Sequence, residues 1–372
     1  MPRWKARSWW ILVLLLLLIA AAAGFRSWSI QRDVAQWEDY RAHCRATGQD
    51  LGVESWLPAP VPDEDNVFRH PWMSVFLDSE TSPQAEAVAK MRSRPGLDLE
   101  GYEGPSDGKS WFDGREAEAA GVLQSGKEQA ADLKAIHEVA ARVACQPPVD
   151  LGDSTKDIDG PWTRVSDLGP MLALHADAAM ASGDASLATA HLEAMLRFGN
   201  HLRGGNFLLV TVMGVLFENR AAMIIDVGLS RQLFRPQDRR RLLAAIRTRP
   251  VPDEMVAAMR VERGIFLASL EGEVTKGTPI GFKEKFAAFL NPPRRLVATD
   301  SLHFCRMLEG ILASGASRGA WEDFGRHIHE VSRGEVNPTI EISVSSLVMT
   351  NLAESLFVHE DYLDLLRQNL AE

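Results

Sequence analysis

The strongest hydrophobic signal in the chain is a run at its start. Residues 8–25 carry no charge and are almost wholly apolar. A helix of that length extends roughly 27 Å, close to the ~30 Å hydrocarbon core of a bilayer. Trp9, Trp10 and Trp28 flank the run, as tryptophans do at membrane–water interfaces. The pattern predicts one transmembrane helix within residues 1–30.

The charges around this run predict its orientation. Arg3, Lys5 and Arg7 precede it, and the positive-inside rule then keeps the N-terminus in the cytoplasm. The body would lie in the periplasm or outside the cell, held to the inner membrane by a single span. A cleaved signal peptide is the alternative, because residues 11–20 have the length of an h-region and Ala21–Ala23 are small enough for cleavage.

Beyond this leader, apolar residues recur mainly at the spacing of α-helices. Only the run 336–344 is rich in β-branched residues, and we expect a short extended link there. The pattern predicts an all-α body of antiparallel helical hairpins. Helices are expected at 30–47, 83–94, 115–146, 163–182, 184–203, 207–229, 236–247, 253–274, 281–290, 299–314, 317–332 and 343–372.

Three regions follow from this pattern. Residues 1–30 hold the cytoplasmic N-terminus and the anchor, and residues 31–80 hold a juxtamembrane helix and a proline-rich connector. Residues 81–372 form the helical body. Within the body, residues 96–114 are rich in glycine and contain two Asp-Gly steps, which predicts a loop-rich insertion.

The connector contains the segment LPAPVPDEDNVFRHP, residues 57–71. Its alternating prolines favour an extended polyproline II path. Asp63, Asp65 and Asn66 are N-cap candidates for a short helix, which Pro71 would interrupt or kink. We interpret the segment as a semi-rigid spacer that holds the body close to the membrane.

Residues 163–203 predict a helical hairpin. Ser182, Gly183 and Asp184 combine a helix stop with the N-cap of a following helix. Small residues on both sides of this turn allow close packing, so the unit is similar to a single tetratricopeptide hairpin. A solenoid needs about three such units, and only one is convincing here.

Residues 207–229 form the second most apolar stretch of the chain. Glu218, Arg220 and Asp226 interrupt it. Charged side chains are costly in hydrocarbon, so we predict a buried core helix and not a second membrane span.

The exported part of the chain is acidic. Residues 31–372 hold 36 basic residues against all 50 acidic ones, a formal charge of −14. This charge argues against nucleic acid as a partner and favours solubility. Cys44, Cys145 and Cys305 are far apart in the sequence. An oxidising compartment permits one disulfide among them, but we expect three unpaired, buried thiols.

Two segments suggest metal or acid–base chemistry. Asp157 and Asp159 fit two places of an EF-hand loop, but its end positions lack carboxylates, so an acidic turn is the preferred interpretation. A calcium-steadied module that also uses Asp153 is a third hypothesis for function. Histidines suit metal and proton chemistry, and we consider His175, His303, His327 and His329 for an envelope hydrolase.

Residues 315–319 match G-x-S-x-G, but the helical pattern before them does not fit the strand that a nucleophile elbow requires. No nucleotide-binding or zinc motif occurs in the sequence. We therefore assign no catalytic, cofactor-binding or metal-ligating residue and no cofactor. Arg260, Glu262 and Arg263 lie on one predicted helix. A solvated helix face is the expected role of these charges, with a buried network that fixes helix register as the alternative.

In layout, the chain resembles a group of uncharacterised single-span bacterial envelope proteins. The resemblance rests on the anchor, a Cys–Gly pair, a P-x-P-x-x-x-N segment ending at a proline, a Gly-Asp hairpin and an R-x-E-R helix. In this sequence these residues are Cys44, Gly48, Pro60, Pro62, Asn66, Pro71, Gly183, Asp184, Arg260, Glu262 and Arg263. The resemblance implies a tethered helical body and carries over no catalytic residue. Such proteins often run on further, which fits the uncapped final helix.

These observations favour a membrane-anchored, non-enzymatic protein that works through contacts with other envelope proteins. Its membrane contact would be residues 8–25. The alternative is an envelope hydrolase in which two or more of the histidines converge with an acid in a pocket.

Overall fold

The computed structural model describes most of the predicted helices. The described residues are 3–49, 51–52, 55, 59–79, 81–92, 104–105, 109–146, 159–205, 207–246, 249–276 and 359–371, with short pieces between 298 and 323. Among them the fold is all-α, as predicted, with no β-strand in the described ranges, and an isolated β-bridge joins Asn66 and Ala144.

The helices follow one another along the chain in this order. They are α1 Arg3–Ala46, the 3-10 turn η2 Val67–Arg69, α2 Pro71–Asp78, α3 Pro83–Arg92, α4 Glu116–Glu128, α5 Ala130–Ala140, α6 Asp159–Ala181, α7 Ala185–Arg203, α8 Leu208–Ser230, α9 Pro236–Ala245 and α10 Val251–Lys276. A C-terminal helix covers residues 359–371.

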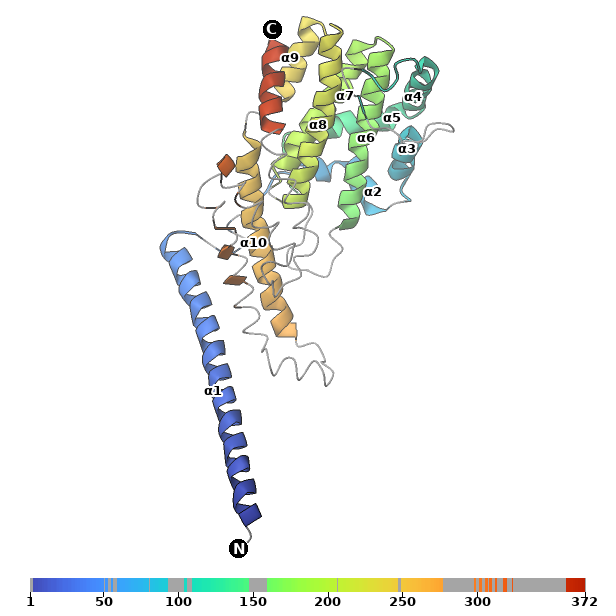
Figure 1. Cartoon of the computed structure of the whole chain (residues 1–372). Helices are drawn as coiled ribbons and strands as arrows, with labels where there is room; N and C mark the ends of the chain where they lie inside the picture. The colour runs from blue at the N-terminus through green and yellow to red at the C-terminus, as the bar shows by residue number, and fades with distance from the viewer. Residues whose placement is uncertain are drawn as a thin grey trace.

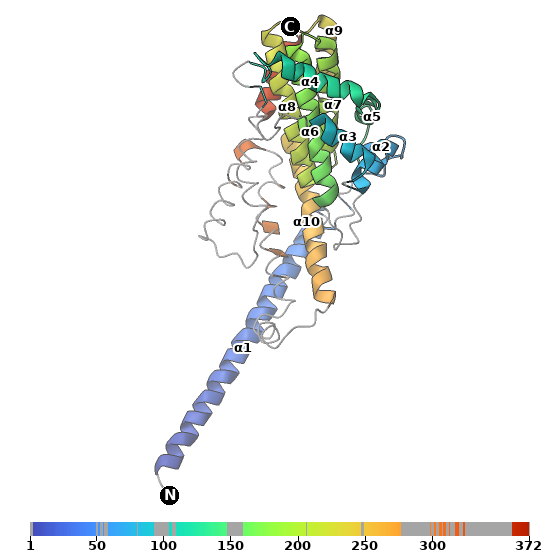
Figure 2. The ribbon, with the colours of Figure 1, turned by 90° about the vertical axis from the view of Figure 1, so that its right-hand side faces the viewer.

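Helices α6, α7 and α8 form the centre of the body. α7 packs against both of the others, with α2 to α5 on one side of this bundle and α9, α10 and the C-terminal helix on the other (Figure 1). Most of the apolar side chains on these helices belong to one continuous buried cluster. α1 leaves the body as a long rod, which both views show (Figure 2).

The predicted hairpin is formed by α6 and α7, and the residues of its turn have the predicted roles. Gly183 has a φ of 75°, a left-handed conformation that glycine adopts without strain. Asp184 then caps α7, and its side chain accepts a hydrogen bond from the Leu187 amide at 3.0 Å. Ala179 and Ala188 are fully buried, so small residues do lie between the two helices.

Helices α7 and α8 cross at two glycines. A Cβ on Gly214 would lie 2.6 Å from the Gly199 carbonyl oxygen and 2.8 Å from the Arg203 amide nitrogen. A Cβ on Gly199 would meet the Glu218 side chain at 2.6 Å. The absence of both side chains therefore lets the two backbones approach until Arg203 and Glu218 share one buried space.

α8 is a core helix, as its interrupting charges predicted. Among the helices with described side chains, it is the one that is long and apolar enough to cross a membrane. More than half of its apolar stretch is buried in the body, and Glu218 is 2% exposed.

The connector is held to the body by Asn66. Its side chain accepts hydrogen bonds from the Phe68 and Gln146 amides, both at 3.1 Å, and donates to the Gln146 carbonyl at 3.0 Å. The predicted N-cap is thus correct. The short helix is also interrupted before Pro71, as predicted, because η2 ends at Arg69 and His70 is extended. Pro71 then starts α2 at a first-turn position where no amide hydrogen is needed.

Other boundaries differ from the sequence predictions. The single helix expected at 115–146 is two helices, α4 and α5, which meet at Gln129. The expected helix at 281–290, the link at 336–344 and most of the insertion at 96–114 lie outside the described residues.

Replacing Gly214 with alanine should destabilise the body by about 1–3 kcal/mol, because the new methyl group would meet backbone atoms that cannot rotate away. Chemical denaturation followed by circular dichroism measures the change. Gly319→Ala is the control, since no atom lies within 4 Å of its Cβ position. Equal stability of G214A and the parent protein would contradict the close crossing.

Candidate functional site

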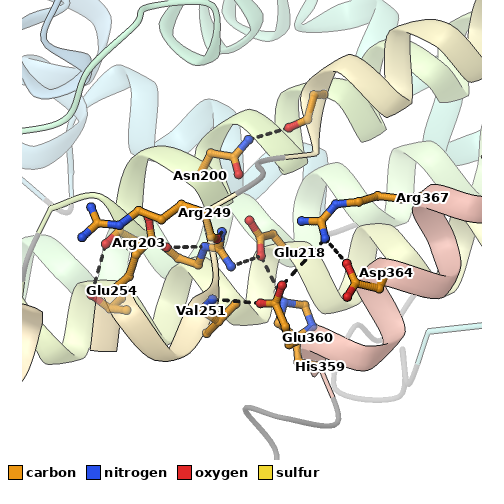
Figure 3. Close-up of polar contacts among 12 residues, drawn as sticks. Asn200, Arg203, Glu218, Arg249, Val251, Glu254, His359, Glu360, Asp364 and Arg367 are labelled. Atoms are coloured by element: carbon orange, nitrogen blue, oxygen red, sulfur yellow. Dashed lines mark hydrogen bonds and ion pairs between the residues drawn. The ribbon is translucent and has the colours of Figure 1, made fainter. Parts of the chain in front are cut away.

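The most unusual feature of the body is a buried group of charged side chains at the end of α7. Arg203 is 0% exposed, and its Nη1 lies 3.2 Å from Oε2 of Glu218 on α8. Its Nε lies 2.9 Å from Oε2 of Glu254 on α10, which is also 0% exposed. One guanidinium therefore joins carboxylates from two other helices inside the protein, and Figure 3 shows this arrangement.

The guanidinium also fixes the connection between α9 and α10. Its Nη2 donates to the carbonyl oxygen of Arg249 at 3.2 Å. One turn earlier on α7, the Asn200 amide donates to the carbonyl of Ala245, at the end of α9 (Figure 3). Asn200 thus satisfies a carbonyl at the end of α9, where the last carbonyls lack intrahelical partners, and Arg203 binds a carbonyl of the connection that follows.

The C-terminal helix completes this network. His359 is 2% exposed, and its Nε2 lies 3.0 Å from the same Glu218 Oε2. The next residue, Glu360, accepts a hydrogen bond from the Val251 amide at 2.8 Å. The Glu360 carboxylate thus satisfies a free amide at the first residue of α10, and its negative charge interacts favourably with the positive end of the helix dipole. The last described helix is therefore attached to the first turn of α10 by polar contacts.

One cation lies between two carboxylates at the centre of this network. Arg203 supplies the positive charge for Glu218 and Glu254, and His359 places a ring nitrogen against the same Glu218 carboxylate. Buried charges are tolerated only when they are paired, and such pairs fix the relative positions of the elements that carry them. The network is suited to setting the register of α7, α8, α10 and the C-terminal helix.

In the R-x-E-R helix, Arg263 is buried and Glu262 is half-buried. Arg263 is 2% exposed, and Glu262 accepts a hydrogen bond from the Leu208 amide at 3.2 Å. Burial raises the pKa of Glu262 above its ordinary value, and the bond from Leu208 partly offsets this effect. The expectation of a solvated face is wrong for these two residues, because α10 packs against α8 along this stretch.

A second polar cluster consists of three histidines from three helices. His137 of α5 and His191 of α7 are joined by a hydrogen bond of 3.1 Å between Nε2 and Nδ1. The ring of His175, on α6, lies 5.8 Å from that of His191 between centroids. Gly126 of α4 makes room for it, since a Cβ there would lie 2.9 Å from Cε1 of His175.

Burial keeps these histidines neutral. It lowers the pKa of His175 to about 4, an effect that a hydrogen bond to the Met91 backbone partly offsets. Burial also lowers the pKa of His191 well below its ordinary value, and the two neighbouring histidines act in the same direction. The pKa of His137 is lowered mainly by burial, with Glu193 opposing the shift.

Of the histidines considered from the sequence, the structure places one in this cluster. His175 is there, whereas His303, His327 and His329 lie outside the described residues. His137 and His191 were missed by sequence reasoning. The sequence signal for His191 is its helical spacing, three residues after Ala188 and four before Met195, which are both apolar and both buried on the inner face of α7.

The metal hypothesis gains no support from the described side chains. Among them, no three histidines, cysteines or acids are arranged to hold a metal ion. Asp153 and Asp157 lie outside the described residues, and only the backbone of Asp159 is placed, at the start of α6.

Comparisons of the chain with protein-family models, with curated proteins and with solved structures found no match. The site must therefore be interpreted from its own geometry.

Replacing Arg203 with methionine should destabilise the body by about 3–5 kcal/mol, because Glu218 and Glu254 would stay buried without their cation. Adding E218Q and E254Q to R203M should recover part of this loss, since the carboxylates become neutral amides. Chemical denaturation gives the free energy of unfolding.

The control for this series is Lys134→Ala. Lys134 forms an exposed pair with Glu138 at 3.4 Å, which should contribute less than ~1 kcal/mol. If R203M unfolds at the same denaturant concentration as K134A, the network does not stabilise the fold.

The buried neutral His175 should make the protein acid-sensitive. In the unfolded chain this histidine binds a proton below about pH 6.5, whereas in the folded protein it does so only near pH 4. Protons therefore favour the unfolded state between these values. The free energy of unfolding is highest above pH 6.5 and decreases as the pH falls toward 4. Asp177 has the opposite effect. Burial raises its pKa to about 6, so the folded protein binds this proton at a higher pH than the unfolded chain does, and acid stabilises the fold at this residue. Its contribution is common to parent and variant.

The parent should lose about 2 kcal/mol more than His175→Asn between pH 7 and pH 5. Denaturation curves at the two pH values measure the difference. His43→Asn is the control, because His43 is exposed on α1. Parallel pH dependence of the parent and H175N would show that His175 is not buried in its neutral form.

Proposed function

We propose that the protein is a membrane-anchored helical protein whose body lies outside the cytoplasm and binds other envelope proteins. The observation that carries this proposal is the single continuous helix α1, which joins the predicted membrane segment to the folded body. The proposal treats the protein as a non-enzymatic interaction module.

The exposed side chains on α1 support a position at a membrane surface. Phe25 is 69% exposed and Trp28 is 53% exposed, at the end of the apolar run. The Arg32 guanidinium lies 5.5 Å from the Trp28 ring centre. Exposed aromatic rings beside arginines are typical of residues at a lipid–water interface.

The helix also supports a fixed distance between membrane and body. α1 continues without a break through Ala21–Ala23, which favours a retained anchor over a cleaved signal peptide. Its first residue buried against the body is Trp37, twelve positions beyond Phe25. At ~1.5 Å per residue, the body would begin about 18 Å from the end of the apolar run.

A surface for a protein partner is available on α8. Leu209, Leu216 and Met223 are 45%, 46% and 40% exposed and follow one another at intervals of seven residues. Residues at this interval lie on one side of a helix and form a narrow apolar stripe, as in helix–helix seams. The proposed partner surface is this stripe, and an amphipathic helix of another envelope protein is the complementary shape.

The likeness of α6 and α7 to a tetratricopeptide unit remains a prediction that rests on one hairpin. The hydrolase alternative has less support, because the contacts of His175 are with the Met91 backbone and with histidine rings. These contacts place no carboxylate beside it that could act with it as a catalytic pair.

The test compares the full-length protein with the double variant Leu209→Glu and Leu216→Glu. Both are expected to stay in the membrane pellet after an alkaline carbonate wash, because the anchor is unchanged. Mild cross-linking and affinity capture should recover a reproducible partner with the parent protein, and its recovery should fall at least tenfold with the variant, because the charges disrupt the stripe.

Val143→Glu is the matched control, since Val143 is 73% exposed and lies outside α8. It should capture the same partner as the parent protein. Release of the full-length protein by carbonate would contradict the anchor. Identical capture by the parent and the double variant would contradict the role of the stripe.

A further inference from the structure

Two of the three cysteines lie in one small cluster. Trp37, Tyr40 and Cys44 follow one another on the inner face of α1 and are nearly inaccessible to solvent. They pack against Leu267 of α10 and against a group from the short described pieces, namely Ala298, Leu302 and Cys305. This cluster, which we term the α1 docking cluster, is the contact between the long helix and the body.

All three thiols are free and buried in the structure, as the sequence predicts. Cys44 and Cys305 belong to the same cluster and lie within electrostatic range of each other and of the Tyr40 hydroxyl. A hydrogen bond joins the Tyr40 hydroxyl and the Cys44 thiol, and both cysteines act on Tyr40 electrostatically. Cys305 is 0% exposed, and its pKa is raised to about 12 mainly by burial, with Arg263 opposing and Cys44 adding to the shift. Their side chains thus occupy one shared, dry space.

The third cysteine is placed elsewhere. Cys145 follows α5 and belongs to the large core cluster around α6 and α7. Burial raises its pKa as well, so it behaves as an inert core residue. Among the three possible pairings, only that of Cys44 with Cys305 joins residues of one cluster.

We propose that Cys44 and Cys305 form a disulfide that fastens α1 to the body. This inference rests on the proposed function, because that proposal places both residues in an oxidising compartment outside the cytoplasm. Disulfides persist in such compartments and are rare in the cytosol. The bond would connect the membrane helix to a position more than 250 residues later in the chain.

The bond forms by thiol–disulfide exchange with an oxidised dithiol protein or glutathione disulfide. One cysteine thiolate attacks the oxidant's disulfide, which gives a mixed disulfide and releases one thiol. The other thiolate then attacks the cysteine sulfur of the mixed disulfide and releases the second thiol. The two cysteines lose two electrons and two protons, and the oxidant becomes two thiols.

The burial of the two thiols determines when the disulfide can form. A thiol with a raised pKa holds little thiolate, and an oxidant cannot reach it while α1 is docked. Oxidation should therefore occur before α1 docks or during its transient separation from the body. Once formed, the bond would be shielded from reductants by the same packing.

The test uses the full-length protein purified in detergent and equilibrated with glutathione and glutathione disulfide at a series of ratios. A mild denaturant is added at sub-unfolding concentration so that α1 can separate. Samples are then unfolded, alkylated and digested without reduction for mass spectrometry. We expect a linked peptide pair containing Cys44 and Cys305, with Cys145 alkylated in all samples.

Two variants sharpen the result. Cys145→Ser should retain the linked pair, whereas Cys44→Ser should leave Cys305 open to alkylation after unfolding, and circular dichroism checks that each variant is folded. Full alkylation of all three thiols at the most oxidising ratio, or a link that includes Cys145, would overturn the proposal. Because the oxidant is supplied in solution, failure here is distinct from failure of the anchor, which the carbonate wash tests.

Discussion

The body depends on the close crossing of α7 and α8 at Gly199 and Gly214. Because neither residue has a Cβ, the two backbones approach until Arg203 and Glu218 are buried in the same space. A buried guanidinium needs carboxylates and carbonyls around it, and these come from α8, α10 and the connection after α9. His359 adds the C-terminal helix to the same group. One steric condition thus sets the register of four helices.

The rest of the molecule is arranged around this crossing. The histidine cluster lies where α5, α6 and α7 meet, and Asn66 attaches the connector to the segment that follows α5. Further along α10, at Leu267, the α1 docking cluster attaches the long N-terminal helix. The described residues therefore combine a packed helical body with a long helix whose first half is the predicted membrane span.

Much of the fold could be predicted because its signals are local. The Gly183–Asp184 turn, the Asn66 cap and the helical period of α8 each depend on a few neighbouring residues. The division of the expected 115–146 helix at Gln129 could not be predicted, because neither proline nor glycine stands at the junction and the nearest glycine, Gly126, lies inside α4. The interruption before Pro71 was predicted but the start of α2 at Pro71 was not, since a proline fits both a helix break and a helix start.

The sequence by itself determined the helical class, the apolar leader, the acidic charge and the position of most helices, because periodicity and cap chemistry are written in adjacent residues. Only the tertiary structure decided which polar residues meet. Arg203 and Glu254, His137 and His191, and Cys44 and Cys305 are each separated by about 50 residues or more. Their contacts arise from the packing of distant helices, which residue spacing along one helix does not encode.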